Sequence, residues 1–143
     1  MNQIDYTPAK DLLKDKIILI TGATAGIGRA AALCFAEHGA TTLLLGRNQE
    51  QLDVIYDEIE NKGFPQPAII PFHLERATEH DYFMLAEQIE DNFGRLDGLL
   101  HNASILGEMT QIESYPDATW QQVMQVNATA PFLMTKTLLP LLR

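Results

Sequence analysis

The sequence has few of the features that mark secreted or membrane proteins. Its 143 residues include a single cysteine, Cys34, which excludes an internal disulfide and fits a reducing cytoplasm. Residues 1–15 are polar with mixed charge, unlike a signal or transit peptide. No apolar run approaches the roughly 18 residues of a membrane span. We therefore expect a cytoplasmic protein with no membrane partner.

Basic residues are also scarce. Lys and Arg together number 10 against 19 Asp and Glu, which gives a formal net charge of −9 at pH 7. This balance disfavours a nucleic-acid partner, because phosphate backbones are bound by clusters of Lys and Arg. The four histidines lack the spacing of metal ligands, so we expect no metal site at His38, His73, His80 or His101.

What the sequence does contain is a fourfold alternation of strand-like and helix-like segments. This order predicts an α/β fold with a Rossmann-type, doubly wound parallel sheet of strand order 3-2-1-4. Pro71 cannot donate to a ladder, so its strand belongs at a sheet edge, as this order requires. We expect residues 1–143 to form a single, incomplete dinucleotide-binding domain that is truncated after the fourth helix. The expected strands are residues 17–21, 41–45, 68–72 and 97–101.

Polar residues mark the starts of two helices. Asn48 is expected to cap the second helix, and Thr78 with Asp81 is expected to form a capping box for the third. In the first helix, the spacing of apolar residues predicts one buried stripe, on which the thiol is inert packing. The stripe consists of Ile27, Ala31, Cys34 and Phe35.

A glycine-rich segment, residues 21–28, joins the first strand to the first helix. Gly22 allows a tight turn, Gly26 lets backbone N–H groups approach a pyrophosphate, and Gly28 lets the helix pack close to the strand. A purely structural turn is the alternative, but the strand before it and the amphipathic helix after it favour dinucleotide binding. The expected cofactor contacts in this loop are Gly22, Thr24, Gly26, Ile27 and Gly28.

Three motifs, in this order, resemble those of the short-chain dehydrogenase/reductase family. They are the Thr-Gly-x-x-x-Gly-x-Gly spacing of residues 21–28, the segment His101-Asn102-Ala103-Ser104 and Asn127 on the last helix. Residues 96–103 and 120–127 look especially like the bacterial YciK-type oxidoreductases. The resemblance covers nearly the whole chain but only the first half of a family member.

This resemblance implies an oxidoreductase that exchanges a hydride between a nicotinamide and a carbonyl or alcohol carbon of a small-molecule substrate. It implies that Asn102 and Ala103 lie at the cofactor and that Asn127 anchors a water in a proton relay. Asn127 as a polar core residue beside a simple kink is the alternative. Ser104 stands where the family has glycine, and serine adds strain if the backbone there needs a positive φ.

The end of the second predicted strand indicates which dinucleotide is preferred. NAD-preferring folds place an acidic residue there, but nothing between Gly39 and Arg47 is acidic. Gly46 leaves room, and Arg47 beside Asn48 can pair with a 2′-phosphate, so NADP(H) is expected over NAD(H). A solvated surface arginine is the alternative. After the third strand, His73 and Leu74 replace the family's aspartate region; Leu74 can cover the adenine, and His73 is either a cofactor contact or a surface residue.

The family's catalytic serine and Tyr-x-x-x-Lys motif have no counterpart in the sequence. None of its four tyrosines, at positions 6, 56, 82 and 115, has a lysine four residues later. A tyrosine acid needs a nearby cation to work near neutral pH. We therefore expect the cofactor-binding half of an oxidoreductase, inactive alone. A non-catalytic dinucleotide-binding or interaction protein is the alternative, and a flavin or adenosyl-cofactor binder is a weaker one.

The last predicted helix, from about residue 117 towards 139, carries two further expectations. Pro131 lies four residues after Asn127 and removes a helical hydrogen bond, so the helix should kink. Much of its circumference is apolar, and the fourth strand beside it should have an open edge. These features predict a homo-oligomer formed through the last helix, or pairing with the missing half.

Overall fold

A computed structural model of the chain describes residues 6–142; residues 1–5 and Arg143, which the predicted domain includes, lie outside the described residues. Its centre is a four-stranded sheet of order β3-β2-β1-β4 in which every neighbouring pair is parallel. The predicted α/β fold and strand order are confirmed. The strands are β1 (Ile17–Thr21), β2 (Thr41–Gly46), β3 (Ala68–Pro71) and β4 (Gly98–Leu100).

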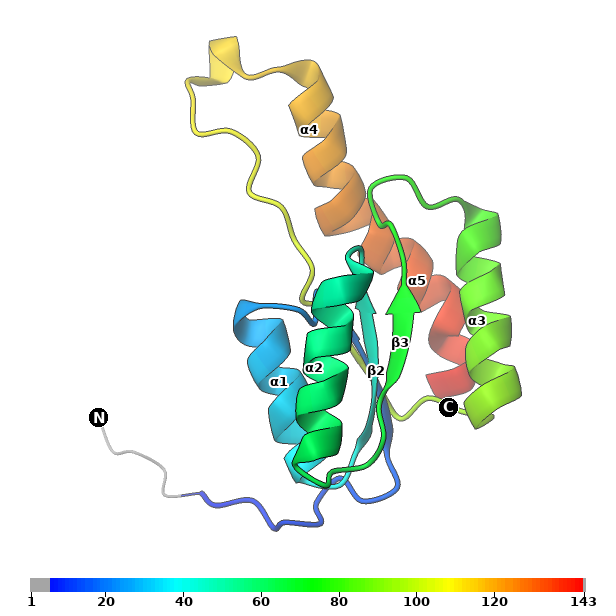
Figure 1. Cartoon of the computed structure of the whole chain (residues 1–143). Helices are drawn as coiled ribbons and strands as arrows, with labels where there is room; N and C mark the ends of the chain where they lie inside the picture. The colour runs from blue at the N-terminus through cyan, green and yellow to red at the C-terminus, as the bar shows by residue number, and fades with distance from the viewer. Residues whose placement is uncertain (1–5, 143) are drawn as a thin grey trace.

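Helices cover both faces of this sheet (Figure 1). On one face, α1 (Gly26–Glu37) and α2 (Gln49–Asn61) enclose a core that includes Ile20 and Leu44. On the other, α3 (Glu79–Phe93) and α5 (Ala130–Leu138) enclose a core that includes Leu19. Successive strand residues point to opposite faces, so an unbroken apolar strand supplies both cores.

The helix starts confirm the predicted caps. The Asn48 side chain accepts a hydrogen bond from the Gln51 N–H at 3.1 Å at the start of α2. At the start of α3, the Thr78 hydroxyl accepts from the Asp81 N–H, and the Asp81 carboxylate accepts from the Thr78 N–H. These bonds satisfy backbone donors that a helix start leaves without an internal partner.

The predicted buried stripe of α1 is wrong by one position along the helix. Ile27 is 79% exposed and Cys34 is exposed, so the thiol is not core packing. The residues that α1 buries are small ones: Gly28, Ala32 and Ala36. The helix lies close to the sheet at these small residues, while the larger Leu33 and Phe35 pack against the edge of the same core and are only partly buried.

The region predicted as one kinked helix is a composite. It consists of α4 (Asp117–Met124), a π-helical turn η2 (Gln125–Thr129), α5 and a 3₁₀ segment η3 (Leu139–Leu142). The π turn lies directly before Pro131, whose missing N–H removes a helical hydrogen bond there, and the expected kink stays a prediction. The 3₁₀ turn η1 (Ile112–Ser114) precedes α4.

Helix α4 and the loop that follows β4 extend away from the sheet (Figure 1). Large apolar side chains are exposed along α4 and α5, with Trp120 at 56% and Phe132 at 63%. β4 is at one edge of the sheet. Self-association through this surface stays a prediction. Within residues 6–142, every helix is too short or too polar to cross a bilayer.

Candidate functional site

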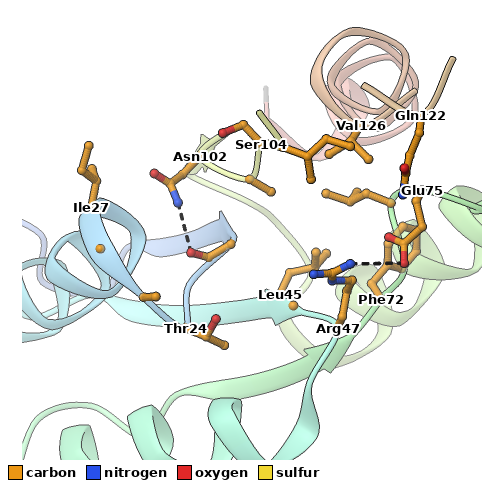
Figure 2. A pocket seen from close by; sticks show the side chains of 17 residues that line it. Thr24, Ile27, Leu45, Arg47, Phe72, Glu75, Asn102, Ser104, Gln122 and Val126 are labelled. Carbon is orange, nitrogen blue, oxygen red and sulfur yellow. Dashed lines mark hydrogen bonds and ion pairs between the residues drawn. The ribbon is translucent and has the colours of Figure 1, made fainter. Parts of the chain in front are cut away.

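A cavity of about 530 Å³ lies where the carboxyl ends of β1, β2 and β4 meet (Figure 2). In doubly wound sheets, ligands bind at this position, outside the carboxyl ends of the strands. Residues from the glycine loop, the ends of β2, β3 and β4, and the helix after the long loop line it. They are Gly22, Thr24, Ala25, Gly26, Ile27, Leu45, Gly46, Arg47, Phe72, Leu74, Glu75, Asn102, Ala103, Ser104, Ile105, Gln122 and Val126.

Three glycines shape the loop at the floor of the cavity, each in a different way. Gly22 has φ 63°, and a Cβ there would lie 2.9 Å from the Cα of Ala103. A Cβ on Gly28 would overlap the carbonyl oxygen of Gly22 and the side-chain nitrogen of Asn102. Gly26 has φ 54°, and a Cβ there would meet open space. Gly28 is thus required by packing, Gly26 by its backbone conformation, and Gly22 by both.

The start of α1 is a candidate anion-binding site, because no side chain caps its backbone N–H groups. Its N-cap, Ala25, makes no side-chain hydrogen bond, and the first turn, which includes Arg29, contains no acidic residue. The first N–H groups of a helix carry a partial positive charge, which a capping side chain normally satisfies. The uncapped N–H groups beside Gly26 and Ile27, which line the cavity, can therefore bind a phosphate group.

Thr21 and Asn102 join the glycine loop to the end of β4. The Thr21 hydroxyl accepts hydrogen bonds from the N–H groups of Asn102 and Ala103, both at 3.0 Å. The Asn102 side-chain amide donates to the carbonyl of Gly22 at 3.0 Å. The structure therefore brings the first and second predicted motifs together. This role of Thr21 was not predicted, although a polar residue at the end of an apolar strand is a sequence signal that indicates it.

Arg47 lies in the cavity beside a carboxylate that sequence analysis did not predict. Its Nη1 is 3.7 Å from Oε1 of Glu75, and Nδ1 of His73 is 3.3 Å from the same oxygen. Partial burial raises the pKa of Glu75, but hydrogen bonds from the backbone and His73, with the charge of Arg47, outweigh burial and lower it. Glu75 is therefore ionised at neutral pH.

The other predicted cofactor residues separate into two groups. Leu74 lines the cavity and is 7% exposed. His73 instead lines a neighbouring hollow of about 360 Å³ together with Arg76, and its side chain is 41% exposed. Asn48 serves as the cap of α2, and Gly28 serves close packing. The structure does not place His73, Asn48 or Gly28 in the lining of the cavity.

Asn127 fixes the long loop that follows β4. Its side-chain oxygen accepts from the Ile105 N–H at 2.9 Å, and its side-chain nitrogen donates to the Ile105 carbonyl at 2.8 Å. Asn127 is exposed, which corrects the alternative that it is a polar core residue. Ile105 lines the cavity, so Asn127 positions one of its walls.

The expected strain at Ser104 is absent from the described part of the chain. Among residues 6–142, Asp15 is the one non-glycine residue with a positive φ. Ser104 therefore replaces the family's glycine without entering the left-handed region. Beside it, Nε2 of His101 is 2.8 Å from the hydroxyl of Thr135, and burial lowers the pKa of His101. This contact joins the end of β4 to α5.

Phe72, Gln122 and Val126 line the cavity but, like Glu75, were not predicted from the sequence. Phe72 was assigned to the third strand, but β3 ends at Pro71 and Phe72 faces the cavity. Gln122 and Val126 lie about 50 residues after Phe72 in the sequence. Only the tertiary structure brings them to the cavity. Within the described residues, no group of three or more His, Cys, Asp or Glu side chains is placed to hold a metal ion.

Known proteins with the same architecture match this chain closely. Residues 16–143 match the short chain dehydrogenase family. The chain is 46% identical over 137 residues to the uncharacterized oxidoreductase YciK of Escherichia coli K12, covering 96% of this chain and 54% of that protein. It thus spans about half the length of the curated relatives it matches.

Solved structures agree with the fold. A short-chain dehydrogenase structure from Pseudomonas syringae has 51% identity and a TM-score of 0.94, covering 98% of this chain and 58% of that one. A structure from Escherichia coli CFT073, complexed with NADPH, has 46% identity and a TM-score of 0.91, covering 94% of this chain and 56% of that one. With its glycine loop, its Asn102 and Asn127 contacts and these matches, the chain belongs to the short-chain dehydrogenase family.

Proposed function

We propose that this chain is the cofactor-binding half of an NADP(H)-dependent short-chain oxidoreductase. The observation that carries this proposal is the guanidinium of Arg47 in the cavity at the end of β2, where NAD-preferring folds have an acidic residue. The relative from Escherichia coli CFT073 that is complexed with NADPH supports the same preference.

The residues present fit such a cofactor. The uncapped start of α1 and the open space at Gly26 suit a pyrophosphate, and Arg47 suits a 2′-phosphate. Leu74 would offer an apolar face to the adenine, and Asn102 and Ala103, which line the cavity, would lie beside the nicotinamide ribose. The bound cofactor would supply or accept a hydride at the carbonyl or alcohol carbon of a small-molecule substrate. The chain's own part is to hold and orient it.

We propose no catalytic role for this chain alone, since the family's serine and Tyr-x-x-x-Lys have no match in it. Proton transfer by tyrosine requires a cation nearby to lower its pKa. In the full enzyme, Asn127 would support the water relay. Its hydrogen bonds to Ile105 hold the wall of the cavity that Ile105 forms. We also propose that the protein is cytoplasmic and forms a homo-oligomer through α4 and α5.

The test is fluorescence titration of the 143-residue chain with NADPH and NADH. Arg47→Gln should weaken NADPH binding about tenfold, because a charge-assisted phosphate contact is worth roughly 1.5–3 kcal/mol, and should change NADH binding little. Arg76→Gln is the matched control, since this nearby arginine lies outside the cavity lining. A wild-type chain that binds neither dinucleotide at physiological concentrations would contradict the proposal.

A second candidate is a non-catalytic dinucleotide-binding or interaction protein. The exposed apolar side chains of α4 and α5, such as Trp120 and Phe132, favour it because they offer a partner surface. The coding sequence after Arg143 separates the two candidates. An in-frame Tyr-x-x-x-Lys supports the oxidoreductase, whereas a stop codon followed by unrelated sequence supports the binding protein.

A further inference from the structure

The cavity contains a fixed negative charge beside its proposed phosphate-binding arginine. Glu75 and Arg47 both line the cavity, and their Oε1 and Nη1 atoms are 3.7 Å apart. Figure 2 shows the two side chains directed toward each other, with their ion pair as a dashed line. The Glu75 side chain is 24% exposed, whereas that of Arg47 is 64% exposed. The carboxylate is therefore the better anchored partner of the two.

Contacts from its own loop hold Glu75 in this place. Nδ1 of His73 lies 3.3 Å from Oε1, the oxygen that also faces Arg47. The N–H of Arg76 donates to the carbonyl of His73 at 3.2 Å, so the loop turns tightly around Glu75. The hydrogen bonds and the arginine keep the pKa of Glu75 below its usual value despite partial burial. The charge persists at neutral pH.

This arrangement affects the two dinucleotides differently. A 2′-phosphate carries nearly two negative charges and must compete with Glu75 for the guanidinium of Arg47. The 2′-hydroxyl of NADH carries no charge and can donate a hydrogen bond to a carboxylate. A carboxylate at this point therefore opposes the phosphate and tolerates or favours the hydroxyl.

We propose that Glu75 is a specificity-determining residue that limits the preference of this cavity for NADPH over NADH, by competing with the 2′-phosphate for Arg47. The inference rests on the proposed cofactor function. The expected effect is opposite to that of removing Arg47: removing the Glu75 carboxylate should increase the affinity for the phosphorylated cofactor.

The experiment measures calorimetric binding of two fragments that differ only by the 2′-phosphate, adenosine 2′,5′-bisphosphate and adenosine 5′-monophosphate. In Glu75→Gln, the dissociation constant of the bisphosphate should fall about three- to tenfold, as expected for removing one like charge near the surface. That of the monophosphate should stay constant or rise. Glu87→Gln removes the same charge from the exposed side of α3 and should leave both constants unchanged.

Each outcome decides the inference. A selectivity ratio that is unchanged or lower in Glu75→Gln overturns it, because Glu75 would then be neutral or would orient Arg47 for the phosphate. Glu75→Ala must raise the ratio as well, and circular dichroism shows that both variants are folded. If wild type binds NADPH but the ratio does not rise, only this inference fails. If wild type binds no dinucleotide, the proposed function fails with it.

Discussion

In the first two βα units the backbone is held by packing, whereas in residues 101–129, the loop after β4 with α4 and η2, side-chain hydrogen bonds take over much of this role. The central residues of β1 and β2 are buried, with α1 and α2 covering one face of the strands and α3 and α5 the other. All three residues of β4 and all eight of α4 are at least partly exposed. Asn127 with Ile105, and Thr119 with Glu108 at 3.0 Å, fasten the loop in between.

The two regions form different sides of the candidate site. The packed region supplies the glycine loop and Arg47 on one side of the cavity. The hydrogen-bonded region supplies the opposite wall, with Ile105 and Gln122. A region with few buried contacts opens locally at low cost in free energy. We therefore expect mutations in the first region to affect global stability and mutations in the second to affect local opening.

The largest expected effect is that of Gly28→Ala in the packed region. The added Cβ would overlap the backbone oxygen of Gly22, which cannot move without displacing β1, so the free energy of unfolding should fall by about 3 kcal/mol. Urea denaturation measures this change. Gly107→Ala in the long loop is the matched control, because its Cβ meets the ends of the Tyr115 and Val123 side chains.

The control carries its own, smaller cost. Gly107 has φ 78°, so alanine adds backbone strain of about 1 kcal/mol, while the neighbouring side chains can turn away. Equal losses for the two alanine variants would show that the two regions are packed equally tightly. That result would contradict the comparison between them.

Asn127→Ala is expected to have an intermediate effect, confined to the second region. It removes two hydrogen bonds to the backbone of Ile105, and the free energy of unfolding should fall by about 1 kcal/mol. Hydrogen exchange of residues 104–116 should accelerate while that of β1 and β2 stays slow. Asn92→Ala is the control, since its side-chain bond to the Gln88 carbonyl stays within α3. Uniformly faster exchange would contradict local opening.

The smallest expected effect concerns Asp97, which joins the two regions at the sheet edge. Its carboxylate accepts from the Ile17 N–H at 2.8 Å and pairs with Arg95. Burial raises the pKa of Asp97, but these hydrogen bonds and the charges of Arg95 and Lys16 lower it more. A lowered pKa means that the stabilisation is present above about 3.9, the value of a free aspartate, and is lost as the pH falls through the lower folded value.

Asp97→Asn should therefore reduce the free energy of unfolding by about 0.5–1 kcal/mol at pH 7, since the pair is partly exposed. The difference from wild type should shrink as the pH falls below about 3.9. Denaturation curves across this range measure it. Asp57→Asn on the exposed side of α2 controls for the change in net charge. A difference that grows toward acid pH would contradict the assigned sign.

The sequence predicted the fold well because the strands and caps depend on local patterns. Unbroken apolar runs marked β1 and β2, and Asn48 and Thr78 marked the starts of α2 and α3. The face of α1 was predicted wrongly because Ile27, the first large apolar residue of the helix, points outward and is 79% exposed. Close approach of a helix to a sheet selects small residues, and periodicity of large ones then misleads.

The candidate site was predicted in part for the same reason. The glycine loop, Arg47, Leu74, Asn102 and Ala103 line the cavity, and motifs of fixed spacing pointed to them. Glu75 was missed because its importance comes from Arg47, 28 positions earlier in the chain, and no local pattern links the two. The π turn at η2 was missed because Pro131 requires only that a hydrogen bond be lost.

By itself, the sequence determined the strands, the helix caps and the glycine loop, since each depends on residues close together in the chain; the parallel sheet and its order followed from the alternation of strands and helices. Tertiary structure alone decided which face of α1 is buried, where His73 and Glu75 point, and that Asn127 fastens Ile105. These outcomes depend on how closely distant elements approach. That distance is set by packing the whole domain, not by any single segment.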